Sequence, residues 1–232
     1  MTSDARSAGT RLTAALLTAG AVAGLVITTV SLTLAVTRPG FDPTRHANSL
    51  LALGDWGWVQ SVNFVVCGLL LLAFGVGIWR STVGVRSGRI AAVCVAVYGL
   101  LAGVVVGFNP ADPGFGFPPG APKGYPGVAE MSTSAKIHGV AGLLGFLAVT
   151  CGCFALARYF AIVGDRLWAV WSGGIGIAVL SVSGYLALNT GEQTGTFNYV
   201  PTWVVGSVLW LFVAAVAVRL LRSHRDTHVG AQ

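Results

Sequence analysis

One aspartate and one histidine stand out as a pair that could do chemistry. Asp112 lies in a segment rich in Pro, Gly and Phe, residues 108–120, and His138 begins the apolar run that follows it. An imidazole beside a carboxylate can act as a general acid or base. The two could also bind a metal with a third or fourth ligand, for which the available residues are Asp55, His46 and Glu192. Alternatively, Asp112 accepts a hydrogen bond or salt bridge that pins the segment.

Further polar and aromatic side chains could contact a substrate around this pair. The three Phe residues of segment 108–120 favour apolar surroundings and argue against disorder, so we expect the segment to fold back over the end of a helix bundle. Glu192 could be one of these contacts, or it could simply be a solvated loop residue. The residues expected to bind substrate are Asp55, Gln60, Asn63, Asn109, Phe115, Phe117, Lys136 and Glu192.

The elements that must position these residues are transmembrane helices. The chain is 54% hydrophobic and 9% charged, against roughly 25% charged in a soluble domain. Six stretches without Asp, Glu, Lys or Arg each exceed the roughly 20 residues that a helix needs to cross the hydrocarbon. They predict an all-α membrane protein, a six-helix bundle spanning residues 12–220 between an N-terminal tail, 1–11, and a C-terminal tail, 221–232. The predicted spans are 12–36, 57–79, 90–108, 137–157, 167–188 and 202–219.

The distribution of basic residues predicts the orientation of the bundle. Ten of the fourteen Lys and Arg residues lie in the two tails, in the short connectors 80–89 and 158–166, and at Arg219, the end of the last predicted span. By the positive-inside rule both termini are cytoplasmic, in a multi-pass protein of the plasma membrane. The long loops 38–55, 109–136 and 189–201 then lie outside, and we expect them to be structured. The net charge of +6 is spread over connectors without a basic stripe, so we expect no nucleic acid partner.

Several familiar chemistries are excluded by what the sequence lacks. It contains no Walker loop, no GxSxG elbow and no HExxH motif. No His pair is placed within the spans to hold a haem, and no charged residue lies deep in a span to relay protons. We therefore expect no metal and no cofactor, and whether the chain is an enzyme stays open.

Glycines at every fourth position predict close helix packing. Gly99, Gly103 and Gly107 form such a ladder on the third span. Small residues let helix backbones approach where lipid supplies no hydrophobic driving force. The ladder could pack within one subunit, or it could dock a second copy or another membrane protein.

Four stretches together resemble a known family. They are SLLALG, GWVQ and NF within residues 49–64, FNPADP at 108–113, KIHG at 136–139, and LWL at 209–211. Over roughly residues 45–222 the chain resembles the bacterial, chiefly actinobacterial, membrane family catalogued as domain of unknown function 998. Many members have a Gln-Arg pair before the last span, where this chain has FNY at 197–199. The resemblance implies a six-helix membrane fold and draws attention to Asp112 and His138, but it implies no reaction.

Three functions fit these residues. The first is binding or processing of an amphipathic, lipid-like small molecule at the outer face of the bundle. The second is a non-catalytic envelope or scaffold protein that docks other helices through the glycine ladder. The third is a membrane cyclase or isomerase of prenylated substrates that uses a loop carboxylic acid, supplied by Asp55, Asp112 or Glu192.

Overall fold

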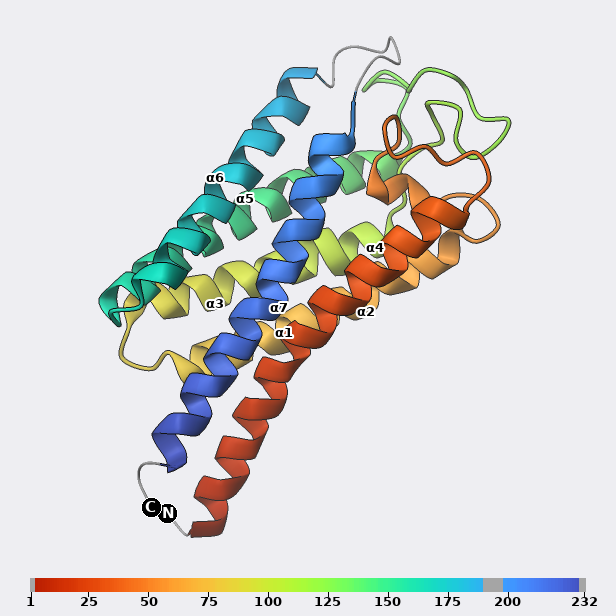
Figure 1. Ribbon diagram of the computed structural model, residues 1–232. Coiled ribbons are helices and arrows are strands. Elements are labelled where there is room, and N and C mark those ends of the chain that lie inside the picture. The colour runs from red at the N-terminus through yellow and green to blue at the C-terminus, as the bar shows by residue number, and fades with distance from the viewer. Residues whose placement is uncertain (1–2, 190–197, 230–232) are drawn as a thin grey trace.

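The computed structural model, which describes residues 3–189 and 198–229, is a bundle of long helices (Figure 1). Within these described residues, six helical segments are long and apolar enough to cross a membrane, and each predicted span lies within one of them. The six-helix prediction is therefore confirmed, and the arrangement is that of a multi-pass membrane protein. The elements are α1 (Ser3–Thr37), η1 (Asn48–Ala52), α2 (Gly57–Ser81), α3 (Arg86–Tyr98), η2 (Gly99–Val105), α4 (Val106–Phe108), α5 (Thr133–Ile162), α6 (Arg166–Asn189) and α7 (Val200–Val229).

The helices pack as a curved row whose two ends meet loosely. Neighbours follow the order α6, α5, α3, α2, α1 and α7, and α6 touches α7 much less than the other neighbours touch each other. In Figure 1 α7 runs beside α1, so that the start of α1 and the end of α7 lie at the same end of the bundle. Tyr98 of α3 is buried at the centre, with its ring 6.4 Å from Phe146 of α5 and 5.5 Å from Trp210 of α7.

The predicted glycine ladder packs against α2 of the same chain. The third transmembrane helix is built from α3, the π-helical turn η2 and α4, and the ladder lies in its last part, with Gly99 and Gly103 in η2 and Gly107 in α4. A Cβ added to Gly103 would lie 2.5 Å from the Cα of Gly68, and one added to Gly99 would lie 2.7 Å from the Gly68 carbonyl oxygen. Such distances show backbone against backbone, the packing that small residues permit. Association with a second copy or another membrane protein stays a prediction.

The two ends of the bundle differ in structure. At one end, which we call the capped end, residues 38–56 and 109–132 fold together into a cap over the helices. The opposite end, which we call the basic end, holds the short connectors 82–85 and 163–165 and the outer parts of α1 and α7. There Arg219 of α7 forms a salt bridge of 2.7 Å with Asp165. The prediction of structured loops is thus confirmed for the two loops that build the cap.

Candidate functional site at the capped end

The cap has a small core of its own around Phe117. The Phe117 ring is 0% exposed and packs with Leu50, Leu53 and Ala111, which come from both loops. The ring of Phe41 meets it edge-on at 5.1 Å. Aromatic pairs in this geometry stabilise beyond the area that they bury. Phe117, predicted to contact substrate, therefore lies at the centre of the cap, where it holds the loops together.

His46 joins the two loops of the cap to each other and to α7. Its Nδ1 accepts a hydrogen bond of 2.9 Å from the backbone N–H of Asp42, and its Nε2 lies 3.0 Å from the Phe115 carbonyl oxygen. Because Nδ1 is an acceptor, the proton of the neutral ring is on Nε2, which donates to that carbonyl. The backbone carbonyl of His46 in turn accepts from the indole N–H of Trp203 at 2.9 Å. One loop residue thus ties segment 38–56 to the second loop and to α7.

Arg38, just after α1, holds the end of η1 and the turn that leads into α2. Its guanidinium donates to the carbonyl oxygens of Leu51 at 3.1 Å and Leu53 at 2.6 Å, and it lies 5.3 Å from the centre of the Phe117 ring. Burial lowers the pKa of Arg38, and the charge of Asp55 opposes that shift. Asp55, predicted to contact substrate, is exposed on the cap surface, where its negative charge favours the charged form of Arg38.

Phe115 lies where the cap meets the start of α7. It adopts a left-handed backbone conformation, φ 57°, which is rare for a residue with a side chain. Its ring stacks on Tyr125 at 5.4 Å and meets Tyr199 at 6.2 Å. Tyr199 also donates its backbone N–H to the Thr44 carbonyl at 2.9 Å. Burial raises the pKa of Tyr125. A hydrogen bond from the backbone of Asp112 has the smaller, opposite effect and lowers this pKa.

Tyr199 gives the cap a defined response to high pH. Burial raises its pKa from 10.0 to about 12. Between these values the unfolded chain loses the proton while the folded chain keeps it, so the stability that is complete below pH 10 falls as pH rises toward 12. We expect thermal melts of the cap, followed by Tyr fluorescence, to show a smaller loss over this interval in Tyr199→Phe than in the parent chain. An equal loss in both proteins would contradict the assignment.

Asp112 secures the start of α5. One of its carboxylate oxygens accepts a hydrogen bond of 2.8 Å from the backbone N–H of Ser132. Ser132 is the N-cap of α5, and its hydroxyl accepts from the Ala135 N–H at 3.1 Å. N-cap contacts of this kind satisfy N–H groups that the helix leaves without partners. This is the contact expected of a residue that pins the loop.

His138 connects the end of α4 to the start of α5. We call this junction, where Asn109 and Pro110 meet Ser134 and His138, the seam between α4 and α5. The Nδ1 of His138 lies 2.8 Å from the backbone carbonyl oxygen of Asn109, and the Ser134 hydroxyl donates to the Pro110 carbonyl at the same distance of 2.8 Å. The side-chain amide of Asn109 donates to the Val105 carbonyl at 2.8 Å. The carboxylate of Asp112 and the imidazole of His138 thus have separate partners.

Gln60 and Asn63 form a polar network inside the capped end of the bundle. Both are buried, and they are joined by a hydrogen bond of 3.2 Å from the Asn63 amide to the Gln60 carbonyl oxygen. The Gln60 amide also donates to the Ser31 hydroxyl at 3.0 Å and to the Asn48 side chain at 3.2 Å. Cys67 donates to Asn63 at 3.5 Å. The network joins α1, α2 and η1 with internal partners, as buried polar groups require.

The residues of the predicted site do not form one cluster in the structure: Asp112, His138 and the Gln60–Asn63 pair each have separate partners. Lys136 is exposed, and because it lies two residues before His138 on a helix its side chain leaves on nearly the opposite face. Glu192 lies outside the described residues. Neither Arg38 nor Trp203 is among the predicted site residues, and His46 is predicted only as a possible metal ligand. The one local signal is Phe41, whose ring lies 5.2 Å from that of His46; the other partners of His46 are far away in the sequence.

The comparisons with known proteins identify a family, and the described residues contain no metal-binding cluster. In the part of the chain that the structure describes, no group of three or more His, Cys, Asp or Glu side chains could hold a metal ion. Searches of curated proteins and of solved structures find no match. A family model described as protein of unknown function (DUF998) matches residues 21–219, from the middle of α1 into α7, a range that includes both loops of the cap. The chain is therefore a member of the DUF998 family.

Proposed function

We propose that this protein binds an amphipathic, lipid-like molecule at the capped end of the bundle, with His138 as the polar contact. We propose further that it resides in the plasma membrane with both termini in the cytoplasm. The excess of Arg in the tails and short connectors supports this orientation, which turns the capped end outward.

One observation carries the proposal: the tautomer of His138. A carbonyl oxygen can only accept, so the contact with Asn109 requires a proton on Nδ1 of the ring. The other nitrogen, Nε2, then carries a lone pair. Among the described residues no protein donor hydrogen-bonds to it, although the half-buried ring is held firmly in place. A fixed acceptor of this kind suits a ligand that brings a hydroxyl or other donor group.

The surroundings suit the apolar part of such a ligand. Phe108, at the end of α4, is 73% exposed, and Ile137, the neighbour of His138 on α5, is 41% exposed. Gly142, one helical turn after His138, has nothing within 4 Å of the position where a Cβ would be. The seam that carries His138 is thus bordered by apolar side chains and an open backbone, and polar groups among apolar walls are what small-molecule sites usually offer.

Two substitutions of His138 separate ligand binding from structure. His138→Asn can still donate to Asn109 but has no group at the position of Nε2, whereas His138→Gln places a polar group near Nε2 and lacks the Nδ1 donor. We expect the Asn variant to keep the thermal stability of the parent in nanodiscs and to bind 1-oleoylglycerol about tenfold more weakly, the loss of one buried hydrogen bond. Native mass spectrometry of the bound lipid measures this change.

The Gln variant is the matched control. It should be less stable than the Asn variant, because the Asn109 carbonyl loses its donor, yet it should retain more 1-oleoylglycerol. If both variants bind this lipid as the parent does, His138 has only a structural role and the proposed function is wrong.

A further inference from the structure

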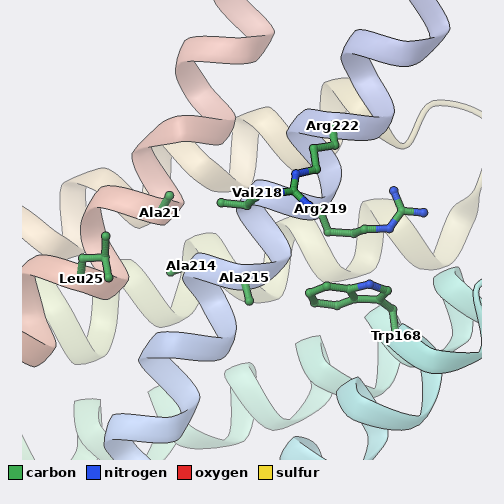
Figure 2. A pocket seen from close by; sticks show the side chains of 8 residues that line it. All are labelled: Ala21, Leu25, Trp168, Ala214, Ala215, Val218, Arg219 and Arg222. Atoms are coloured by element: carbon green, nitrogen blue, oxygen red, sulfur yellow. The ribbon is translucent and has the colours of Figure 1, made fainter.

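A groove at the basic end has no part in the site at the cap. It lies where α7 passes α1 and the start of α6, and it has a volume of about 400 Å³. That is within the range of small-molecule sites. Figure 2 shows the side chains that line it, which are Ala21, Leu25, Trp168, Ala214, Ala215, Val218, Arg219 and Arg222.

The groove is apolar along its length and basic at one end. Ala215 and Val218 form its α7 wall, and Arg222 follows them at the outer end. From Ala215 to Arg222 the helix rises by about 10 Å. The indole of Trp168, near the start of α6, stands beside this wall (Figure 2), and amphipathic rings of this kind are enriched at membrane interfaces. A long apolar chain can therefore lie along the groove with its polar group at the arginine end.

The two arginines at this end differ in the contacts that they make. Arg219 is fully engaged: its Nε donates to Asp165 at 2.9 Å, its Nη2 forms the salt bridge of 2.7 Å with the same carboxylate, and its Nη1 donates to Ser223. Arg222 is exposed, and among the described residues it has no ion pair. Figure 2 shows its side chain bent back along α7 toward Val218, over the groove.

From this arrangement we infer that the groove binds one acyl chain of an anionic phospholipid, whose phosphate contacts Arg222. The Arg219–Asp165 pair contributes no net charge, so the groove presents the single positive charge of Arg222 beside apolar walls. A basic side chain near the membrane surface attracts anionic lipid, and its long stem covers apolar surface while the guanidinium reaches the head groups. Leu25, Ala215 and Val218 of the lining are exposed within helices apolar enough to cross a membrane, which favours a lipid over a soluble phosphate ester.

The test compares two lipids that share their acyl chains. Native mass spectrometry of the detergent-solubilised protein, titrated with palmitoyl-oleoyl phosphatidylglycerol or phosphatidylcholine, measures the preference for the anionic lipid. We expect Arg222→Gln to lower this preference about fivefold, the typical share of one basic residue. Ala215→Phe should lower the binding of both lipids, because Ala215 is an exposed wall of the groove whose enlargement fills it without disturbing the bundle core.

Arg158→Gln is the matched control. Arg158 is an exposed arginine near the end of α5 and does not line the groove, so its removal should leave the preference unchanged. Equal losses from Arg222→Gln and Arg158→Gln would show general surface attraction and overturn the inference. Displacement of the bound phosphatidylglycerol by glycerol 3-phosphate would also overturn it, since a soluble phosphate would then be the preferred occupant.

Discussion

Replacing Gly68 with leucine is expected to abolish the folded protein. A Cβ at this position would lie 2.5 Å from the Gly99 carbonyl oxygen, 2.8 Å from the Val104 nitrogen and 2.9 Å from the Gly103 Cα. All three atoms belong to the backbone of the facing helix, so no side chain can turn aside to make room. Overpacking a core costs about 1–3 kcal/mol even where neighbours relax. We expect Gly68→Ala to reach or exceed the upper part of that range and Gly68→Leu to yield no monodisperse protein.

Fluorescence-detected size-exclusion chromatography after heating measures this effect. Gly174→Leu provides the control, because Gly174 on the exposed face of α6 has nothing within 4 Å of its would-be Cβ. The control should melt at the temperature of the parent. A Gly68→Leu protein that melts there too would show that the contact between α2 and the π-helical turn η2 is dispensable.

Replacing His46 with alanine should open the cap while the helices stay packed. The change removes the acceptor for the Asp42 N–H and the donor to the Phe115 carbonyl, and each partner left unsatisfied costs about 1–3 kcal/mol. It also removes ring contacts of 5.2 Å with Phe41 and 5.4 Å with Phe117. We therefore expect a loss of about 3–5 kcal/mol in the local stability of the cap, the sum of two such hydrogen-bond partners and the ring packing.

Hydrogen exchange can localise that loss. Amide protection should fall in segments 38–56 and 109–132 and remain in the helices, because local opening reports the stability of each unit separately. Arg45→Ala is the matched control, since Arg45 is the exposed neighbour of His46 in the same loop. Unchanged protection of the second loop in His46→Ala would mean that the Phe115 contact does not hold the two loops together.

The six helices could be predicted because membrane spans are defined by composition. Charges are costly in hydrocarbon, so their absence marks each span almost independently of its neighbours. The π-helical turn η2 could not be predicted in this way. Nothing in the run from Gly99 to Val105 distinguishes a π turn from an α turn, since its geometry depends on packing against Gly68 in another helix.

The candidate site shows the same limit. Sequence order placed Asp112 and His138 near one end of the bundle, and both lie there, but their contacts depend on unpaired backbone groups that the sequence does not display. The Asn109 carbonyl at the end of α4 needs a donor and the Ser132 N–H before α5 needs an acceptor. Helix ends leave such groups without partners. Asp112 and His138 therefore hydrogen-bond to these backbone groups and not to each other.

The cap was harder to foresee because its partners are far apart in sequence. His46 follows Arg45 in a polar segment that resembles a solvated loop. Its burial depends on Phe115 and Phe117 in the second loop and on Trp203 in the last helix. Periodicity within one segment cannot report contacts between segments, so the loop aromatics were expected at a ligand and instead pack mainly on one another.

The pairing of α1 with α7 has a consequence for biogenesis. A Cβ on Gly24 would lie 2.3 Å from the Trp210 carbonyl oxygen, so the first and last helices touch backbone to backbone. During synthesis α1 enters the membrane first and must wait for nearly the whole chain before its partner arrives, and contacts between such distant segments form late. A nascent chain that ends after α6 would leave this face of α1 uncovered, available to insertion chaperones or to membrane proteases. Arrival of α7 is thus the step that converts an assembly intermediate into the finished protein.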